Sequence, residues 1–264
     1  MASSNAAKSA SRREQLRAAR EREAAAARRK RITVVAVAVV VAAVLVAVIA
    51  MAAGGVFGKR SGGSGATSTV VSVRPPHASP GDKGVFSADN VNDSAPVLTV
   101  VDYFQCPICH TYETVFGPVF ESLAKKGEIR LEYRTRYFLD INLKNDSSVR
   151  AARAAAIADI FGKYQEYHDT VFSNQPAKEG VGYTDDQLRD AFPQAAGITG
   201  DDLSTFQSSY DKGEMNAFVD AVDRQAQADG YNGTPTFLAN DRKIDMPRKT
   251  NPTEDDIMKL VRVV

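Results

Sequence analysis

The sequence predicts an α/β domain over residues 85–264, in the order strand, helix, strand, helical block, hairpin and helix. Three observations support this prediction. The apolar run Val97–Val101 is typical of a strand that is buried on both faces. Residues 147–229 have helical spacing, and residues 236–245 have strand composition around a two-residue turn. Roughly 180 residues are enough to bury a single hydrophobic core.

The segment after the first strand predicts a helix and then a second strand. Val115, Val119 and Leu123 lie at helical spacing, and Lys125-Lys126-Gly127 ends the helix. Residues 129–138 then alternate between two sides of a strand. One side carries Ile129, Leu131, Tyr133 and Tyr137, and the other carries Arg130, Glu132, Arg134 and Arg136. We therefore expect a half-exposed strand away from the centre of the sheet.

Individual residues predict where helices begin and end within the helical block, residues 147–229. We expect Gly162 to break it, and Thr184 and Thr199 each suit the N-terminus of a helix. A further helix ends at Gly230. This block is predicted to be an insert between the second strand and the hairpin.

The last elements also have recognisable ends. Asn240-Asp241 is predicted to form the two-residue turn of the hairpin. Thr253 is predicted to cap a final helix, with Asp256 at its third position.

The N-terminal part of the chain predicts a membrane anchor. Residues 1–31 contain ten Lys or Arg and three Glu, a charge of +7, whereas the remainder carries −6. Residues 32–53 are 22 residues without a charge, which as a helix span about 33 Å, enough for a bilayer core. The basic residues directly before them place residues 1–31 in the cytoplasm and the rest outside it. We interpret the basic segment as a sorting signal at a membrane, and we expect no nucleic-acid partner.

Two other kinds of N-terminal segment, a cleaved signal peptide and a lipoprotein anchor, are less consistent with the sequence. A cleaved signal peptide has an apolar region of about 7–15 residues, shorter than residues 32–53, although Ala50 and Ala52 leave cleavage open. A lipoprotein anchor needs a cysteine just after the apolar run, and the sequence has none there. We therefore expect an uncleaved signal-anchor helix in the lipid of a cell membrane, followed by a flexible Gly/Ser/Pro linker over residues 54–84.

Cys106 and Cys109, in the motif CPIC, are the only cysteines of the chain. They lie between a predicted buried strand and a predicted helix. The N-terminal turn of a helix stabilises a thiolate, lowering a cysteine pKa from ~8.5 to about 3.5–7.5. Pro107 suits this turn because it has no N–H to leave unpaired. We predict that Cys106 is the nucleophile and that the more buried Cys109 is the resolving thiol.

Two other functions of this cysteine pair are less consistent with the sequence. A structural disulfide across so short a loop removes little chain entropy and therefore stabilises weakly. A structural zinc site needs four ligands, and the three histidines, His77, His110 and His168, are scattered along the chain. We expect neither a metal nor another cofactor.

A second motif, GTPTF at residues 233–237, places Pro235 directly before the hairpin. Together with the CPIC motif, the helical insert and the stretch YHDTVFSNQP at residues 167–176, it gives residues 85–264 a resemblance to the thioredoxin superfamily. The chain resembles in particular the DsbA-like thiol–disulfide oxidoreductases of bacteria. The resemblance implies that Pro235 is cis and packs beside Cys106. It also implies that Thr234 offers its backbone to an extended substrate.

The sequence departs from this family at two positions. Ile108 lies between the cysteines, where the most oxidising members carry a histidine; His110, after the pair, either reaches the thiolate or is simply exposed. Val100 occupies the position where many relatives bury an acid that relays protons. Asp102 has the same strand parity as Val100, and either substitutes for that acid or points to solvent. Both departures concern the redox potential of the pair.

The function that follows is a membrane-tethered, extracytoplasmic enzyme that donates disulfides to secreted or cell-envelope proteins. Oxidised Cys106–Cys109 would accept electrons from substrate thiols, and a membrane redox partner would reset the pair. Two alternatives remain open. One is a reductase or isomerase of the same fold. The other is a tethered peptide-binding module in which the disulfide has only a structural role.

Overall fold

The computed structural model describes residues 73–90 and 92–262. The chain divides into two units, residues 1–68 and 69–264, and the described residues all belong to the second. The predicted cytoplasmic segment, the predicted membrane helix and the start of the predicted linker lie outside the described residues. Within the described ranges, no helix has both the length and the apolar character needed to cross a bilayer.

Five strands form one sheet in the order β1-β3-β2-β4-β5. β2 and β3 are parallel, and the other neighbours are antiparallel. Their bounds are β1 Val85–Phe86, β2 Val97–Asp102, β3 Arg130–Thr135, β4 Thr236–Ala239 and β5 Arg242–Ile244. β2 lies at the centre, and the predicted burial of this strand on both faces is confirmed, with Leu98 and Val101 fully buried.

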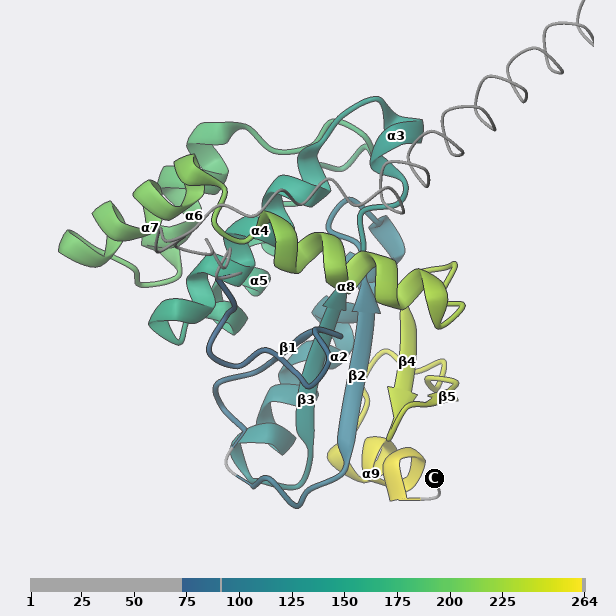
Figure 1. Cartoon of the computed structure of the whole chain (residues 1–264). Coiled ribbons are helices and arrows are strands. Elements are labelled where there is room, and N and C mark those ends of the chain that lie inside the picture. Colours follow the sequence, from purple (N-terminus) through teal and green to yellow (C-terminus); the bar gives the residue numbers. More distant parts are fainter. Residues whose placement is uncertain (1–72, 91, 263–264) are drawn as a thin grey trace, which may run out of the picture. The chain divides into compact units, whose positions relative to one another are not determined.

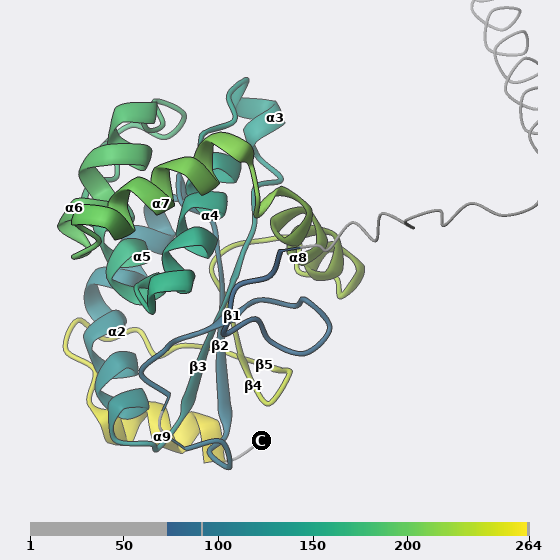
Figure 2. The ribbon, with the colours of Figure 1, turned by 60° about the vertical axis from the view of Figure 1, so that its left-hand side comes forward.

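Helices cover both faces of the sheet. Figure 2 shows α2 (Pro107–Lys125) and α9 (Glu254–Arg262) on one side and α8 (Asn216–Ala228) on the other. The remaining helices follow β3 in the chain and lie beyond the carboxyl ends of β2 and β3 (Figure 1). They are α3 Asp140–Leu143, α4 Ser147–Ala158, α5 Tyr164–Ser173, α6 Phe192–Ala195 and α7 Gly200–Lys212, with a 3-10 turn η1 at Asp159–Phe161 and a π-helical turn η2 at Gln187–Ala191. The predicted α/β order with a helical insert is confirmed.

Aromatic side chains fix α2 against the sheet. Phe116 and Phe120 on α2 are buried, and their rings lie 6.0 Å apart. The ring of Phe237, on β4, lies 6.2 Å from that of Phe120. Burying each such side chain contributes roughly 1.5–3 kcal/mol. The helix that begins at the cysteine pair therefore has a rigid support.

Several predicted element ends are confirmed. Asn240 and Asp241 both have positive φ, 48° and 63°, as a two-residue hairpin turn of type I′ requires. The Thr253 hydroxyl accepts the Asp256 N–H at 3.3 Å, and the Asp256 carboxylate accepts the Thr253 N–H at 2.9 Å, which is a capping box. Thr199 occupies the N-cap of α7, but its side chain makes no capping hydrogen bond.

The prediction that β3 is half exposed is wrong. Glu132 and Arg134 are buried, and so is Arg136 just beyond the strand. The carboxylate of Glu132 and that of Asp241 in the hairpin turn each accept a hydrogen bond from Arg134, at 3.0 and 2.7 Å. Arg136 donates to Asp223 on α8 at 2.6 Å. The alternation of apolar and charged residues shows which side chains share a face of the strand. It does not show whether the charged face is exposed, because ion pairs with other elements can bury it.

The prediction of a flexible linker that ends at Gly84 is also wrong for its last part. Residues 73–84 pack on the folded domain, where Ala78 pairs with Val85 and Ser79 is buried. The N–H and Nδ1 of His77 both lie 2.8 Å from the carboxylate oxygens of Asp159. A buried carboxylate needs hydrogen-bond partners, and Asp159, after α4, obtains both from this segment. The domain therefore begins before residue 85.

Candidate active site

Cys106 lies at the junction of a buried loop and the start of α2. It is the N-cap of the helix, and its backbone is extended, with φ −80° and ψ 116°. Pro107 is the first helical residue, as predicted. The Cys106 Sγ accepts the N–H of Cys109 at 3.3 Å. Both cysteines are free thiols and buried, with Cys109 less exposed (3%) than Cys106 (8%).

The two thiols have opposite acidities because their surroundings differ. The hydrogen bond from the Cys109 thiol is the largest influence on Cys106; with the Cys109 N–H it outweighs burial and lowers the pKa of Cys106 from 9.0 to about 6. Burial, and then the neighbouring Cys106 sulfur, raise the pKa of Cys109 far above its ordinary value. At neutral pH, therefore, Cys106 is a thiolate and Cys109 a neutral thiol.

The Thr234–Pro235 segment lies beside the cysteine pair. The peptide bond between these residues is cis, the geometry that the resemblance implies. The carbonyl oxygen of Thr234 lies 3.7 Å from the Cys106 Sγ. The position follows from the sheet, because β4 begins at Thr236 and pairs there with Val101 on β2.

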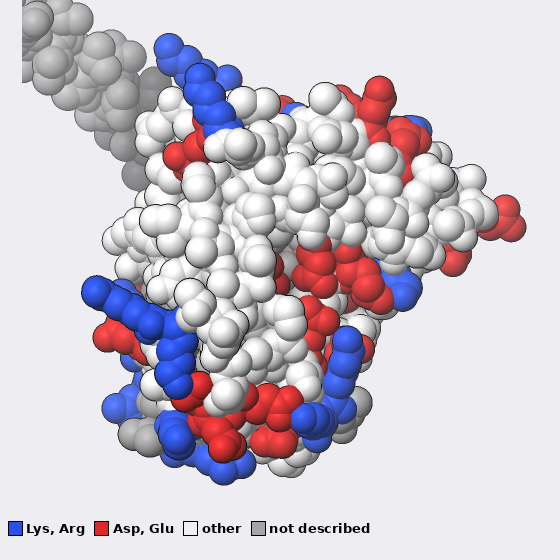
Figure 3. All heavy atoms as spheres, turned by 180° about the vertical axis from the view of Figure 1, so that it is seen from behind, with Lys and Arg blue, Asp and Glu red and all other residues white. Residues whose placement is uncertain are grey.

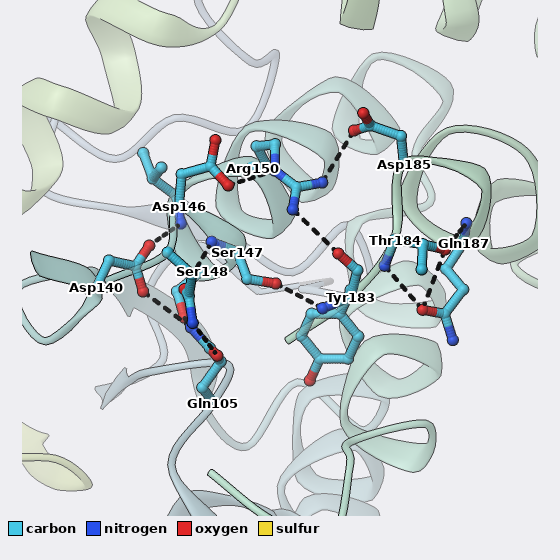
Figure 4. A network of polar contacts seen from close by, with 12 residues as sticks. Gln105, Asp140, Asp146, Ser147, Ser148, Arg150, Tyr183, Thr184, Asp185 and Gln187 are labelled. Atoms are coloured by element: carbon cyan, nitrogen blue, oxygen red, sulfur yellow. Dashed lines mark hydrogen bonds and ion pairs between the residues drawn. The ribbon is translucent and has the colours of Figure 1, made fainter. Parts of the chain in front are cut away.

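A buried glutamine connects the cysteine loop to the helical insert. The Nε2 of Gln105, directly before Cys106, lies 2.9 Å from Asp140 Oδ1 and 3.0 Å from Ser148 Oγ. Figure 4 shows these side chains converging from the loop, α3 and α4. The insert therefore fixes the backbone immediately before the nucleophile.

Two further side chains of the insert hold the same loop. The hydroxyl of Tyr183 donates to the carbonyl of Phe104 at 2.7 Å. Gln175 Nε2 donates to that carbonyl at 2.8 Å and to the carbonyl of Cys106 at 3.1 Å. Tyr183 is fixed in turn by Ser147, whose hydroxyl accepts its N–H at 2.6 Å (Figure 4). Sequence reasoning missed these residues; Gln175 lies within the stretch that carries the family resemblance.

Asp102, the last residue of β2, is buried, so the interpretation that it points to solvent is wrong. Its Oδ2 lies 2.7 Å from Nε2 of His168 on α5. Burial acts to lower the pKa of His168, but the hydrogen bond to Asp102 and the carboxylates of Asp169 and Glu113 outweigh it and raise the pKa to about 10. Sequence reasoning assigned His168 no role in the site. The only available signal was its position in the stretch YHDTVFSNQP.

The residues between the cysteines are exposed, whereas His110 after them is half-buried. Ile108 is 59% exposed. Among the described residues, the hydrogen bonds of the Cys106 sulfur are with Cys109 and Thr234, and none involves the His110 ring. In the described part of the chain, the His110 ring therefore makes no hydrogen bond to the Cys106 sulfur.

An apolar hollow of about 240 Å³ lies beside the first turns of α2. Tyr112, Val115 and Phe116 line it on the helix, and residues 247–250 line it from the segment between β5 and α9. This arrangement offers an apolar surface next to the cysteine pair.

A thiolate and a thiol at the start of a helix, beside a cis proline, define a thiol-redox site on an α/β fold. Residues 92–261 match the family model described as Thioredoxin, and the chain belongs to this family. The predicted thioredoxin-like fold with a helical insert is therefore confirmed. None of the curated proteins compared with the chain matches it.

Solved structures with this fold include thiol–disulfide redox proteins of Mycobacterium tuberculosis and Corynebacterium diphtheriae. DsbG, a disulfide bond oxidoreductase from Mycobacterium tuberculosis, is 27% identical with a TM-score of 0.52, covering 64% of this chain and 83% of that one. Reduced DsbA from the same organism is 25% identical with a TM-score of 0.51, covering 62% and 86%. MdbA, a thiol-disulfide oxidoreductase from Corynebacterium diphtheriae, is 19% identical with a TM-score of 0.53, covering 64% and 87%. The predictions of a DsbA-like protein and of a thiol–disulfide oxidoreductase are confirmed.

Proposed function

We propose that this enzyme donates disulfides to secreted or cell-envelope proteins. The difference in acidity between the two cysteines is the observation on which the proposal rests. The pKa of Cys106 is about 6, whereas burial raises that of Cys109. A stabilised thiolate favours the reduced form of the pair, which makes the disulfide form a stronger oxidant.

The reaction follows from this difference. A substrate thiolate attacks the Cys106 Sγ of the oxidised pair, an S–S bond forms to substrate, and the Cys106–Cys109 bond breaks. The Cys109 sulfur leaves and takes up a proton. A second substrate thiolate then attacks the substrate sulfur of the mixed disulfide, and Cys106 leaves as a thiolate. Two electrons pass to the pair, and a membrane redox partner removes them to reset the enzyme.

The surroundings of the pair support roles in binding and proton transfer. We assign the backbone of Thr234, beside Cys106, to pairing with an extended substrate segment. Exposed Ile108 and the apolar hollow along α2 would accept its side chains. Asp102, whose charge contributes to raising the pKa of Cys109, is assigned to proton exchange with that thiol.

Sequence features support the location. The uncharged residues 32–53 and the basic residues 1–31 favour a single-pass anchor with a cytoplasmic N-terminus. The catalytic domain would then lie outside the cytoplasm, where disulfides persist. In spheroplasts, protease should digest the domain while residues 1–31 remain protected. Protection of the domain would contradict this topology.

The reduction potential of the full-length chain, measured by equilibration in glutathione buffers, tests the proposal. A value near ~−120 mV is expected of a disulfide donor. A value near ~−270 mV would instead identify a reductase, the second candidate, which Ile108 between the cysteines favours.

A further inference from the structure

A hollow separate from the cysteine pair lies between α2 and α5. It has a volume of about 240 Å³ and is lined by Glu113 and Glu121 from α2 and by Asp169 and Phe172 from α5. Figure 3 shows acidic side chains gathered in a recess on the face of the molecule that α2 occupies. Sequence reasoning expected no metal because the histidines are scattered, but the fold brings two of them to this region: His110 lines the hollow, and His168 lies next to Glu113 and Asp169.

His168 forms a group with Glu113 and Asp169, in which one ligand atom from each residue lies within 4.8 Å of those of the other two. Its side chain is fully buried, and Nε2 is occupied by Asp102 at 2.7 Å. Within residues 73–90 and 92–262, Nδ1 has no hydrogen-bond partner. This nitrogen faces Asp169, whose Oδ1 lies 3.5 Å away. A ligand atom of Glu113 lies within 4.8 Å of both groups.

We propose that Glu113, His168 and Asp169 bind one divalent transition-metal ion of the zinc class. Two ligand atoms of a tetrahedral ion with bonds of about 2.0–2.1 Å lie about 3.4 Å apart. The separation of His168 Nδ1 and Asp169 Oδ1 matches this spacing. The Glu113 ligand atom lies within 4.8 Å of both, so a shift of at most about 1.4 Å brings it to the spacing of about 3.4 Å.

The surroundings of the three ligands fit a metal site. Asp102 holds Nε2 of His168, which orients Nδ1 toward the ion, as a carboxylate behind a metal-binding histidine does. The raised pKa of His168 leaves a proton on Nδ1 at neutral pH, and binding of the ion releases this proton to solvent. The imidazole nitrogen favours zinc over magnesium or calcium, which prefer oxygen ligands. Three protein ligands leave at least one position open to the hollow. The three proposed ligands do not include the cysteines, although the site shares Asp102 with the cysteine pair.

Zinc titration of the untagged, metal-free full-length chain tests the site. Cys106 and Cys109 are first oxidised to their disulfide, because free thiols bind zinc themselves. We expect one ion per chain by calorimetry, no competition from excess magnesium, and at least a tenfold loss of affinity in both Glu113→Gln and Asp169→Asn. The matched control is Glu166→Gln, an exposed acid on α5 that pairs with Lys163, which should bind as the parent does.

Two outcomes would overturn the proposal. One is the lack of saturable zinc binding to the oxidised chain. The other is equal affinity in the parent, Glu113→Gln and Asp169→Asn. Thermal unfolding of the metal-free variants verifies folding, and Glu113→Gln alone suffices if Asp169→Asn fails to fold. Thiol exchange is not measured, so failure here leaves the proposed function untouched, and an unexpected reduction potential leaves the metal site untouched.

Discussion

Two buried polar clusters lie at the carboxyl ends of neighbouring strands, and they differ in how completely they are paired. Asp102 ends β2, and Arg136 follows β3 and donates its N–H to the Asp102 carbonyl at 2.9 Å. The side chain of Arg136 is held by Asp223 at 2.6 Å and by the carbonyl of Tyr231. The Asp102–His168 pair keeps Asp102 Oδ1 and His168 Nδ1 without a hydrogen-bond partner in the described part of the chain.

The fully paired Arg136 cluster has a structural role, whereas the Asp102–His168 cluster has unpaired polar atoms that can take part in proton transfer or ligand binding. A buried polar atom without a hydrogen-bond partner costs free energy, and a chemical role is one reason for a folded protein to keep it. The side chain of Arg136 pairs with Asp223 on α8, whereas Asp102 pairs with His168 on α5 and its charge contributes to raising the pKa of Cys109. We therefore expect changes near the cysteines to alter redox chemistry more than stability, and changes at Arg136 to do the reverse.

The largest effect is expected from Cys106→Ser. A hydroxyl cannot form the mixed disulfide, so oxidation of a reduced model protein should fall below detection. Cys109→Ser should instead accumulate mixed disulfides at Cys106, which non-reducing electrophoresis resolves. The peptide-binding alternative predicts two different results. The unsubstituted protein would catalyse no thiol–disulfide exchange, and Cys106→Ser would bind unfolded peptides as tightly as the unsubstituted protein does.

Arg136→Ala tests the structural cluster. It leaves the buried Asp223 carboxylate without its cation, which costs about 3–5 kcal/mol of unfolding free energy. Urea unfolding of the oxidised protein measures this loss. Lys163→Ala, which breaks the exposed pair with Glu166, should cost no more than about 1 kcal/mol. Equal losses in the two variants would show that the Arg136 cluster is not structural.

The acidity of Cys106 gives a pH-dependent prediction. Because only the thiolate reacts, alkylation should be half-maximal near pH 6. Between pH 6 and 9 the unfolded chain binds more protons than the folded one at Cys106, so the reduced form should gain stability as pH rises through this window and lose it as pH falls toward 6. Cys106→Ala should remove this slope. An alkylation midpoint near ~8.5 would show that the helix terminus does not activate the thiol.

Sequence reasoning succeeded where the determinants are local. The cysteine motif, the Asn240-Asp241 turn and the Thr253 cap each depend on a few adjacent residues, and the structure has them where predicted. Long-range pairings were missed. His168 pairs with Asp102, and His77 pairs with Asp159, although the partners are far apart in the sequence. No local sequence pattern predicts such a pairing.

The smallest expected effect is that of Ile108→His. Ile108 is exposed at the start of α2, so a protonated imidazole there is partly screened by water and lowers the pKa of Cys106 by about one unit or less. One unit corresponds to about 1.4 kcal/mol, or about 30 mV in the potential of this two-electron couple. We expect the pair to become more oxidising by that amount, measured in glutathione buffers. Thr111→His, on the exposed surface of the same helix, is the control. An equal shift in both variants would mean that charge anywhere on α2 sets the potential, and that the residue between the cysteines has no special influence.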